Sequence, residues 1–377
     1  MHIQHLSFDP LGHPEVLSAR LRQAVDAGAR AVMVLAGDGA DWPAHQVSPL
    51  LQALPVPVFG AVFPEVIHGV EHSPTGLVVV GLDNHAEVTV VRGLDQPGTD
   101  FAAALASAPT TQDSVLVLVD GLSLRIARFV EAVFDHIGGG PSFIGGGGGS
   151  LSFQPRPCLF TPQGLLAGAA LVVSLDTTLA VGVRHGWQAI AGPFVVTRTD
   201  GNTVQQLDYR PAAEVYQACV GPRVQDTLDA TNFFGHAKGY PFGIERFDGS
   251  LLVRDPIVLQ DQALVCVGEV PEQTAVHILR GDADRLIAAA VEGTEAALAA
   301  LGGPPGGGLL IDCISRVLFL GERFGEELAA VQGCLQRAGA QAHPLIGALT
   351  LGEIANNGAH CLEFYNKTLV LGAYGRG

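Results

Sequence analysis

Charged residues are scarce in this chain of 377 residues, and lysine is the scarcest of them. Charged residues make up 15% of the sequence, and Lys238 and Lys367 are its two lysines. Acidic residues outnumber basic ones by 37 to 21, which gives a formal net charge of -16. A field of that sign repels phosphate backbones and anionic lipid headgroups. We therefore expect neither a nucleic-acid partner nor a membrane partner.

Long apolar runs and closely spaced cysteines are also missing. The most apolar stretch, residues 167–183, is interrupted by Asp176, whereas a membrane-spanning helix needs about 20 mostly apolar residues. The first residues lack the cationic start and apolar block of a signal peptide. None of the six cysteines forms a CxxC pair, which excludes zinc knuckles and thioredoxin-type redox pairs. These features predict a cytoplasmic protein with reduced cysteines.

Apolar residues make up 48% of the chain and alternate between strand-like and helix-like patterns. The patterns predict strands at 31–36, 77–82, 88–91 and 263–267 and helices at 15–27 and 283–301. The turn at 83–84 predicts a hairpin between two of these strands. Because hairpins are frequent, we predict an α/β fold with mixed, largely antiparallel sheets packed with helices, in two halves at residues 1–220 and 221–377.

A glycine-rich segment at residues 137–150 has two interpretations. Eight of its fourteen residues are glycine, so we expect neither a helix nor a well-packed strand there. The backbone amides of Gly145, Gly146, Gly147, Gly148, Gly149 and Ser150 are able to cradle an anion or to approach a ligand. The alternative, which we favour on the residues alone, is a tight structural crossover.

Several strings in the chain match one family in that family's order. In the first half they are residues 57–64 (PVFGAVFP), 145–150, 182–187 (GVRHGW) and 207–212 (LDYRPA). In the second half they are residues 246–257 (RFDGSLLVRDPI), 312–316 (DCISR) and 347–354 (GALTLGEI). Together they resemble the N-terminal and C-terminal halves of bacterial FIST-domain proteins.

The resemblance implies a sensory protein that binds a small molecule such as an amino acid. It also implies signalling in trans, to a histidine kinase or a cyclic-dinucleotide enzyme, since the sensor would take up the whole chain. One group of such proteins binds haem and senses nitric oxide, which gives an alternative function. No nucleophile elbow, zinc-protease motif or other catalytic motif is present, so we predict that the protein is not an enzyme.

An amino-acid ligand would need partners for its two charged groups. Arg316 offers a planar fork for the carboxylate, and Glu353 offers a carboxylate for the ammonium. Cys313, three residues before Arg316, is a further candidate ligand-binding residue, although a buried, inert thiol is the simpler interpretation. The alternative for Arg316 is a direct ion pair with Glu353 or Glu322.

A haem would need an axial ligand and an apolar slot. His185 follows a predicted strand and stands beside Trp187, so these two residues are candidates for the ligand and for part of the slot. His185 is accordingly a metal ligand only if haem is bound. The alternative is a histidine that serves the fold.

Overall fold

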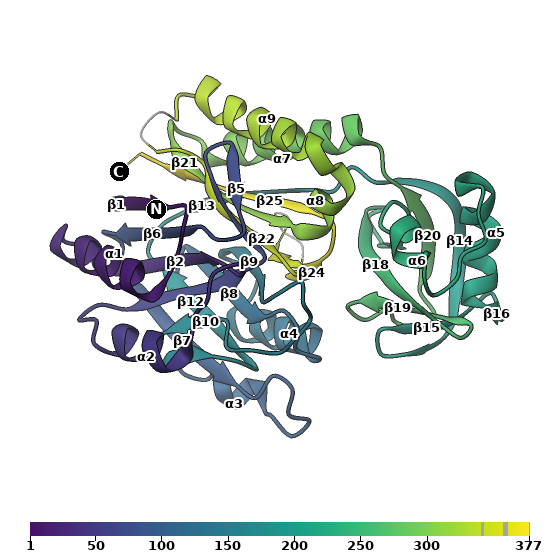
Figure 1. Ribbon diagram of the computed structural model, residues 1–377, viewed down its shortest axis with the longest axis horizontal. Coiled ribbons are helices and arrows are strands. Elements are labelled where there is room, and N and C mark those ends of the chain that lie inside the picture. The colour runs from purple at the N-terminus through teal and green to yellow at the C-terminus, as the bar shows by residue number, and fades with distance from the viewer. Residues whose placement is uncertain (341–342, 357–360, 377) are drawn as a thin grey trace.

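The computed structural model describes residues 1–340, 343–356 and 361–376. Its strands form three six-stranded sheets and a closed six-stranded barrel with one short added strand. Residues 188–280 form the barrel, and the rest of the described chain forms what we call the core (Figure 1). Most strand pairs are antiparallel, and helices pack on the sheets, which confirms the predicted fold class.

The core contains three repeats of one topology. The first consists of β1 (Ile3–Asp9), α1 (Pro14–Asp26), β2 (Ala31–Gly37), α2 (Ala44–Gln52), β3 (Val58–Phe63), β4 (Glu65–His68), β5 (Glu71–Ser73) and β6 (Leu77–Leu82). The second consists of β7 (Ala86–Arg92), α3 (Phe101–Leu105), β8 (Ser114–Asp120), α4 (Ile126–Ile137), β9 (Ser142–Gly148), β10 (Leu159–Thr161), β11 (Gly164–Leu166) and β12 (Ala169–Leu175). The third consists of β13 (Leu179–Arg184), α7 (Ala283–Leu301), β21 (Pro305–Cys313), α8 (Ile314–Leu320), α9 (Phe324–Arg337), β22 (Ile346–Thr350), β23 (Glu353–Ala355), β24 (Glu363–Tyr365) and β25 (Leu369–Gly375). The barrel is thus an insertion into the third repeat, between β13 and α7.

The three repeats interlock through their short hairpins. The sheet orders are β1-β6-β2-β3-β10-β11, β24-β23-β9-β8-β12-β7 and β13-β25-β21-β22-β4-β5. Each sheet therefore takes four strands from its own repeat and a hairpin from another. Because β13 precedes the barrel and pairs with β25 near the C-terminus, the third sheet joins segments from both sides of the barrel insertion.

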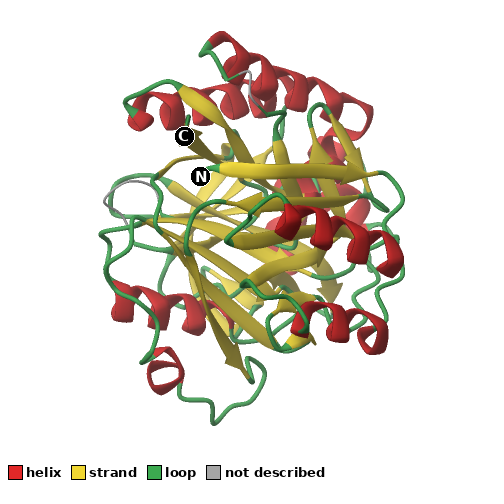
Figure 2. Cartoon of the chain, turned by 90° about the vertical axis from the view of Figure 1, so that its left-hand side faces the viewer, coloured by secondary structure: helices red, strands yellow, loops and turns green. Residues whose placement is uncertain are grey.

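Helices cover the sheets from outside, as the amphipathic patterns require. In α1 the buried residues Leu17, Leu21 and Ala24 recur at helical spacing and face the first sheet. The view in Figure 2 shows strands at the centre of the core and helices around it. No helix among the described residues combines the length and the apolar character needed to cross a membrane.

The glycine-rich segment forms a strand, so the expectation that it cannot do so is wrong. β9 lies where the three sheets meet, and it packs against β3, β13, β21 and β22. A Cβ on Gly146 would lie 2.7 Å from the Gly352 carbonyl oxygen, and one on Gly148 would lie 2.8 Å from the Val62 oxygen. Glycine lets strands of different sheets approach here more closely than any side chain would allow.

The predicted hairpin between residues 77–82 and 88–91 is also wrong. β6 pairs with β1 and β2 in the first sheet, whereas β7 pairs with β12 in the second. The turn at 83–84 is therefore the connection between two repeats.

The barrel is built from β14 (Gln188–Asp200), β15 (Thr203–Leu207), β16 (Arg210–Pro211), α5 (Ala212–Val224), α6 (Phe233–Ala237), β17 (Phe242–Glu245), β18 (Leu251–Gln260), β19 (Ala263–Val267) and β20 (Ala275–Arg280). Pairing of β14 with β15 closes it. Its two connections to the core lie side by side, because Gln188 is paired with Arg280. The predicted boundary at 220/221 falls within α5.

Candidate ligand-binding site

A cavity of about 250 Å³ lies at the junction between the core and the barrel. The core contributes Gly121, Leu122, Leu151, Phe153, Cys313, Ile314, Ser315, Leu318, Leu351, Gly352 and Asn366, and the barrel contributes Phe234, Asp255, Ile257 and Val267. Several of the core residues that line the cavity follow the carboxyl ends of β8, β21 and β22. Each of these strands belongs to a parallel pair. The carboxyl ends of parallel strands are a common place for ligand sites.

At one wall of the cavity, a buried ion pair joins the core to the barrel. Asp255 belongs to β18 of the barrel, and Lys367 lies in the turn between β24 and β25 of the core. The Lys367 Nζ is 3.1 Å from Asp255 Oδ2 and donates to the Lys238 carbonyl at 3.0 Å. Ser315 Oγ also donates to Asp255 Oδ2, at 2.8 Å. Burial raises the pKa of Asp255, and Lys367 and Ser315 oppose that effect.

Two side-chain oxygens of this wall accept no hydrogen bond from the described residues. They are Asp255 Oδ1 and Asn366 Oδ1, and each residue is 1% exposed. The amide of Asn366 is oriented by its Nδ2, which donates to the Tyr365 carbonyl at 2.9 Å. If the amide were flipped, Asn366 Oδ1 would face the Tyr365 carbonyl oxygen, and two acceptors would lie together. Both Asp255 Oδ1 and Asn366 Oδ1 are buried behind the surface of the cavity, so the polar character of this wall comes from the paired Asp255 carboxylate and the Ser315 hydroxyl.

The rest of the cavity is apolar. Leu122, Leu151 and Phe153 approach from the core, and Phe234 and Ile257 approach from the barrel. Phe153 is 56% exposed and Phe234 is 40% exposed, so both aromatic rings stand at the rim. Apolar walls with a few placed polar groups are typical of small-molecule sites.

Cys313 lines the cavity, and Glu353 lies outside its lining. Thr350 Oγ1 donates to Glu353 Oε1 at 2.9 Å, and the Thr368 amide donates to Oε2 at 3.2 Å. Burial raises the pKa of Glu353 from 4.5 to about 8, so the carboxyl is mostly protonated at neutral pH. Burial likewise raises the pKa of Cys313. Cys313 therefore presents a neutral thiol to the cavity and not a reactive thiolate.

Arg316 is fully buried and belongs to the framework behind the cavity. Its guanidinium donates to Glu327 and to the carbonyls of His185 and Leu286. Its Nε also lies 3.2 Å from Asp312 Oδ1. The alternative of a direct ion pair with Glu353 or Glu322 is wrong, because the carboxylates of Asp312 in β21 and Glu327 in α9 occupy the guanidinium. Arg316 therefore ties α8 to β21 and α9.

His185 and Trp187 line a different hollow, a cleft of about 480 Å³ that also contains Arg184, Arg246 and Arg285. The Trp187 amide donates to His185 Nδ1 at 3.0 Å. Burial, helped by the charge of Arg316, lowers the pKa of His185 to about 4, so the ring is neutral. Trp187 itself is buried, and its Nε1 donates to the Lys367 carbonyl at 3.0 Å.

This arrangement does not fit an axial haem ligand. A neutral imidazole that accepts at Nδ1 carries its proton on Nε2, whereas a ligating histidine needs a lone pair at the metal and donates from its other nitrogen. The cleft also sets Arg184, Arg246 and Arg285 among its apolar residues, whereas the faces of a haem require an apolar slot. Haem binding at His185 stays a prediction that the geometry does not support.

The glycine segment does not line the junction cavity. Gly145, Gly146, Gly147 and Gly148 belong to β9, and Gly149 and Ser150 follow it. The Gly147 amide donates to the Gly352 carbonyl at 2.9 Å, and the Gly149 amide donates to the Val62 carbonyl at 2.8 Å. Arg156 donates to Ser150 Oγ at 2.8 Å and pairs with Asp38. These groups are engaged within the protein.

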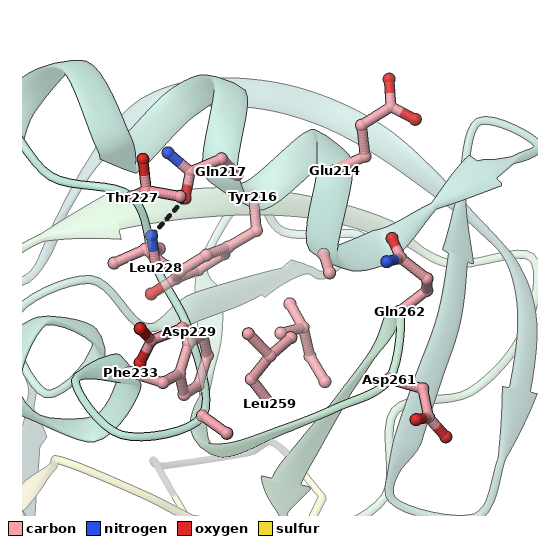
Figure 3. A pocket seen from close by; sticks show the side chains of 13 residues that line it. Glu214, Tyr216, Gln217, Thr227, Leu228, Asp229, Phe233, Leu259, Asp261 and Gln262 are labelled. Atoms are coloured by element: carbon pink, nitrogen blue, oxygen red, sulfur yellow. Dashed lines mark hydrogen bonds between the residues drawn. The ribbon is translucent and has the colours of Figure 1, made fainter.

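An open hollow of about 430 Å³ lies on the barrel beside α5 (Figure 3). Its polar groups serve the local fold: Gln217 Oε1 accepts from the Leu228 amide at 2.7 Å, and Asp229 caps the amides of Thr231 and Asn232. In Figure 3 the carboxylates of Glu214 and Asp261 point away from each other. No group of three or more metal-binding side chains is present in the described part of the chain.

Two family models match the chain: the FIST N domain at residues 30–210 and the FIST C domain at residues 212–356. The chain belongs to the FIST-domain family. FIST domains are sensory domains that bind small ligands. No curated protein matches the chain.

The junction cavity draws on both FIST segments. Leu122 and Phe153 lie in the FIST N match, and Asp255 and Ser315 lie in the FIST C match. Asn366 follows the FIST C match. The cavity is therefore assembled from residues that are far apart along the chain.

Of the candidate ligand-binding residues, Cys313 lies in the lining of the cavity, whereas the residues of the polar wall were not predicted from the sequence. Asp255 and Ser315 stand inside two of the strings that resemble the FIST C-terminal half, and Lys367 is one of two lysines. A lysine in a chain that almost lacks the residue was the available signal. The signal did not identify a partner, because only the folded chain brings Lys367 to the barrel.

Proposed function

We propose that this FIST protein is a cytoplasmic sensor that binds a small molecule in the junction cavity. It reports occupancy in trans to a histidine kinase or a cyclic-dinucleotide enzyme. The observation that carries the proposal is the position of the cavity: its walls come from both the core and the barrel. A ligand there contacts both bodies at once.

Ligand control follows from that position as a shift of population. A bound molecule adds contacts between the core and the barrel and so favours the arrangement in which both sets of walls touch it. The two connections, at Gln188 and Arg280, are adjacent and paired, which leaves the barrel attached along one edge. A change of barrel orientation alters the outer surface that a partner enzyme would contact.

Several polar contacts join the core to the barrel, among them those of Lys367 and Ser315 with Asp255 and that of Lys238 Nζ with the Leu318 carbonyl at 3.2 Å. Besides the Asp255–Lys367 pair, Arg254 Nη1 donates to the Phe364 carbonyl at 2.9 Å, and Arg246 pairs with Glu363 at 3.0 Å. The contacts of Lys367, Arg254 and Arg246 join the barrel to β24 and to the turn after it. They stabilise the arrangement of core and barrel that a bound ligand would stabilise further.

The proposal is tested by filling the cavity. Ile257→Trp places an indole in the cavity. Val258→Trp is the matched control, because Val258 is the next residue of β18 and is 46% exposed, so its indole would lie at the surface. We expect small amides, amines and amino acids screened by thermal shift to include compounds that stabilise the wild type and Val258→Trp. The same compounds should leave Ile257→Trp unchanged. Equal shifts in all three proteins would place binding elsewhere and overturn the proposal.

A further inference from the structure

The cleft around His185, which we call the arginine cleft, gathers cationic side chains from three parts of the chain. Arg184 is the last residue of β13, Arg246 follows β17, and Arg285 lies in the first turn of α7. Among the described residues that line the cleft, Glu292 is the one acidic side chain. Three cations and one carboxylate therefore line it, although the whole chain has a formal net charge of -16.

Two of these arginines are open to an added anion. The side chain of Arg285 is exposed, and its guanidinium forms no hydrogen bond or ion pair with the described residues. Arg184 Nη1 donates to the Val183 carbonyl at 2.7 Å, and Arg184 Nε lies 4.0 Å from Glu292 Oε2. Because the Arg184 and Glu292 side chains are 40% and 66% exposed, an ion pair of that length contributes little.

Arg246, on the barrel side of the cleft, is more engaged. Its Nη2 lies 3.0 Å from Glu363 Oε1, and its guanidinium lies 5.4 Å from the centroid of the Tyr365 ring. Asp248 stands in the same turn, where its Oδ1 accepts from the amide and the hydroxyl of Ser250 at 2.9 and 2.6 Å. The positive charge available to a ligand is therefore that of the two core arginines.

The two available guanidiniums stand at different heights along α7. Arg285 precedes Glu292 by seven residues, which is about 10 Å of helix, and Glu292 marks the height of Arg184. Ala288 and Ala289 lie between them on α7 and also line the cleft. Two cationic positions are thus separated by an apolar stretch.

We propose that the arginine cleft binds a small linear dicarboxylate, with one carboxylate on Arg184 and the other on Arg285. A guanidinium holds a carboxylate with two parallel N–H bonds, and the methylene groups between the carboxylates contact the two alanines. A phosphate ion is too compact to reach both positions. The site lies apart from the junction cavity, so it does not depend on the proposed function.

Three probes separate this charge pattern from a general attraction of anions. Glutarate has a carboxylate at each end, pentanoate has the same number of carbons and one carboxylate, and inorganic phosphate is compact. Isothermal titration of the whole protein with each probe, at constant pH and ionic strength, measures the affinities. We expect glutarate to bind about tenfold or more tightly than pentanoate, since it gains a second charge-assisted pair. Equal affinities for these two, tightest binding of phosphate, or no binding of glutarate at millimolar concentration would overturn the inference.

Arg285→Gln tests one end of the site. The variant should bind glutarate about tenfold more weakly than the wild type, and its folding should be unaffected because the exposed guanidinium has no partner among the described residues. Arg128→Gln is the matched control, because Arg128 is an exposed arginine of α4 outside the cleft. An equal loss of affinity in both variants would show that only the overall charge matters, and it would overturn the inference.

Glu292→Gln tests the other end, where a gain is expected. It removes the one acidic side chain among the described residues of the lining and frees Arg184, so the affinity for glutarate should rise severalfold. An unchanged or lower affinity would overturn the position of a carboxylate at Arg184. Ile257→Trp, which fills the junction cavity, should bind glutarate as the wild type does. Loss of glutarate binding in that variant would move the site to the junction cavity and overturn the inference, whereas the proposed function would stand.

Discussion

The ammonium of Lys367 lies 3.1 Å from Asp255 Oδ2 and joins the core to the barrel at the wall of the ligand cavity. Both side chains are buried, at 0% and 1% exposure. Lys367 also lies over the Trp187 ring, 5.2 Å from its centroid. The pair therefore couples the cavity to the segment that leads into the barrel.

Lys367→Met should destabilise the protein strongly. The change leaves the Asp255 carboxylate buried without its partner, which costs about 3–5 kcal/mol in the free energy of unfolding. Urea denaturation followed by circular dichroism measures the loss. Lys238→Met is the matched control, because the Lys367 Nζ bonds to the backbone of Lys238 and not to its side chain. It removes the hydrogen bond from Lys238 Nζ to the Leu318 carbonyl at 3.2 Å, so we expect a smaller loss of about 1 kcal/mol.

A double variant separates loss of charge pairing from loss of packing. Asp255→Leu combined with Lys367→Met removes both charges, so it should recover part of the stability that the single change loses. If the double variant is less stable than Lys367→Met alone, the ion pair is not the source of the effect.

Glu353 should make stability depend on pH. Its pKa is raised by burial from 4.5 to about 8, so the folded protein holds a proton that the unfolded chain releases above pH 4.5. Stability due to this group is therefore fully present below pH 4.5 and is lost progressively as the pH rises from there to about 8. Unfolding by urea at several pH values should show this decline.

Glu353→Gln should flatten the decline, because glutamine does not titrate. Its amide is able to accept from the Thr368 N–H and donate to Thr350 Oγ1, which keeps the local contacts. Burial also raises the pKa of Asp312, so we expect a smaller slope and not a flat line. A slope equal to that of the wild type would show that Glu353 is not the titrating group.

Gly145→Ala should prevent normal folding of the core. A Cβ at Gly145 would lie 1.8 Å from the Val117 carbonyl oxygen of the paired strand β8. Relief of that overlap requires strand movement where three sheets meet, at a cost of about 3 kcal/mol or more. Soluble yield and urea denaturation measure the effect. Gly140→Ala, where no atom lies within 4 Å of the added Cβ, should behave like the wild type.

The same close contact between a glycine and a carbonyl of its partner strand recurs in each repeat. It shows where prediction from the sequence alone reaches its limit. Gly60, Gly145 and Gly347 occupy corresponding positions, each opposite a carbonyl of its parallel partner strand at 1.8–2.0 Å from the added Cβ. The surrounding residues differ, so the threefold repeat has almost no sequence signal. It is defined by strand pairing.

Local patterns were sufficient for individual elements. Strands at residues 77–82 and 263–267 and the helix at 283–301 have the predicted bounds, because apolar periodicity and flanking turn residues act over short distances. The hairpin at 83–84 was predicted wrongly because a turn signal does not say which strands pair. Neither the interlocked sheets nor the Asp255–Lys367 contact leaves such a local signal.

Haemin titration should give no saturable Soret band that depends on His185. The Trp187 amide holds His185 Nδ1 as an acceptor at 3.0 Å, and burial lowers the pKa of the ring to about 4, so Nε2 carries the proton of a neutral imidazole. Ligation would require this proton to be lost and the hydrogen bond to Trp187 to be broken. Absorption spectra of wild type, His185→Ala and the control His136→Ala with added haemin measure the outcome. A sharp, saturable band that His185→Ala abolishes and His136→Ala retains would refute the tautomer argument and make the cleft around His185 a haem site.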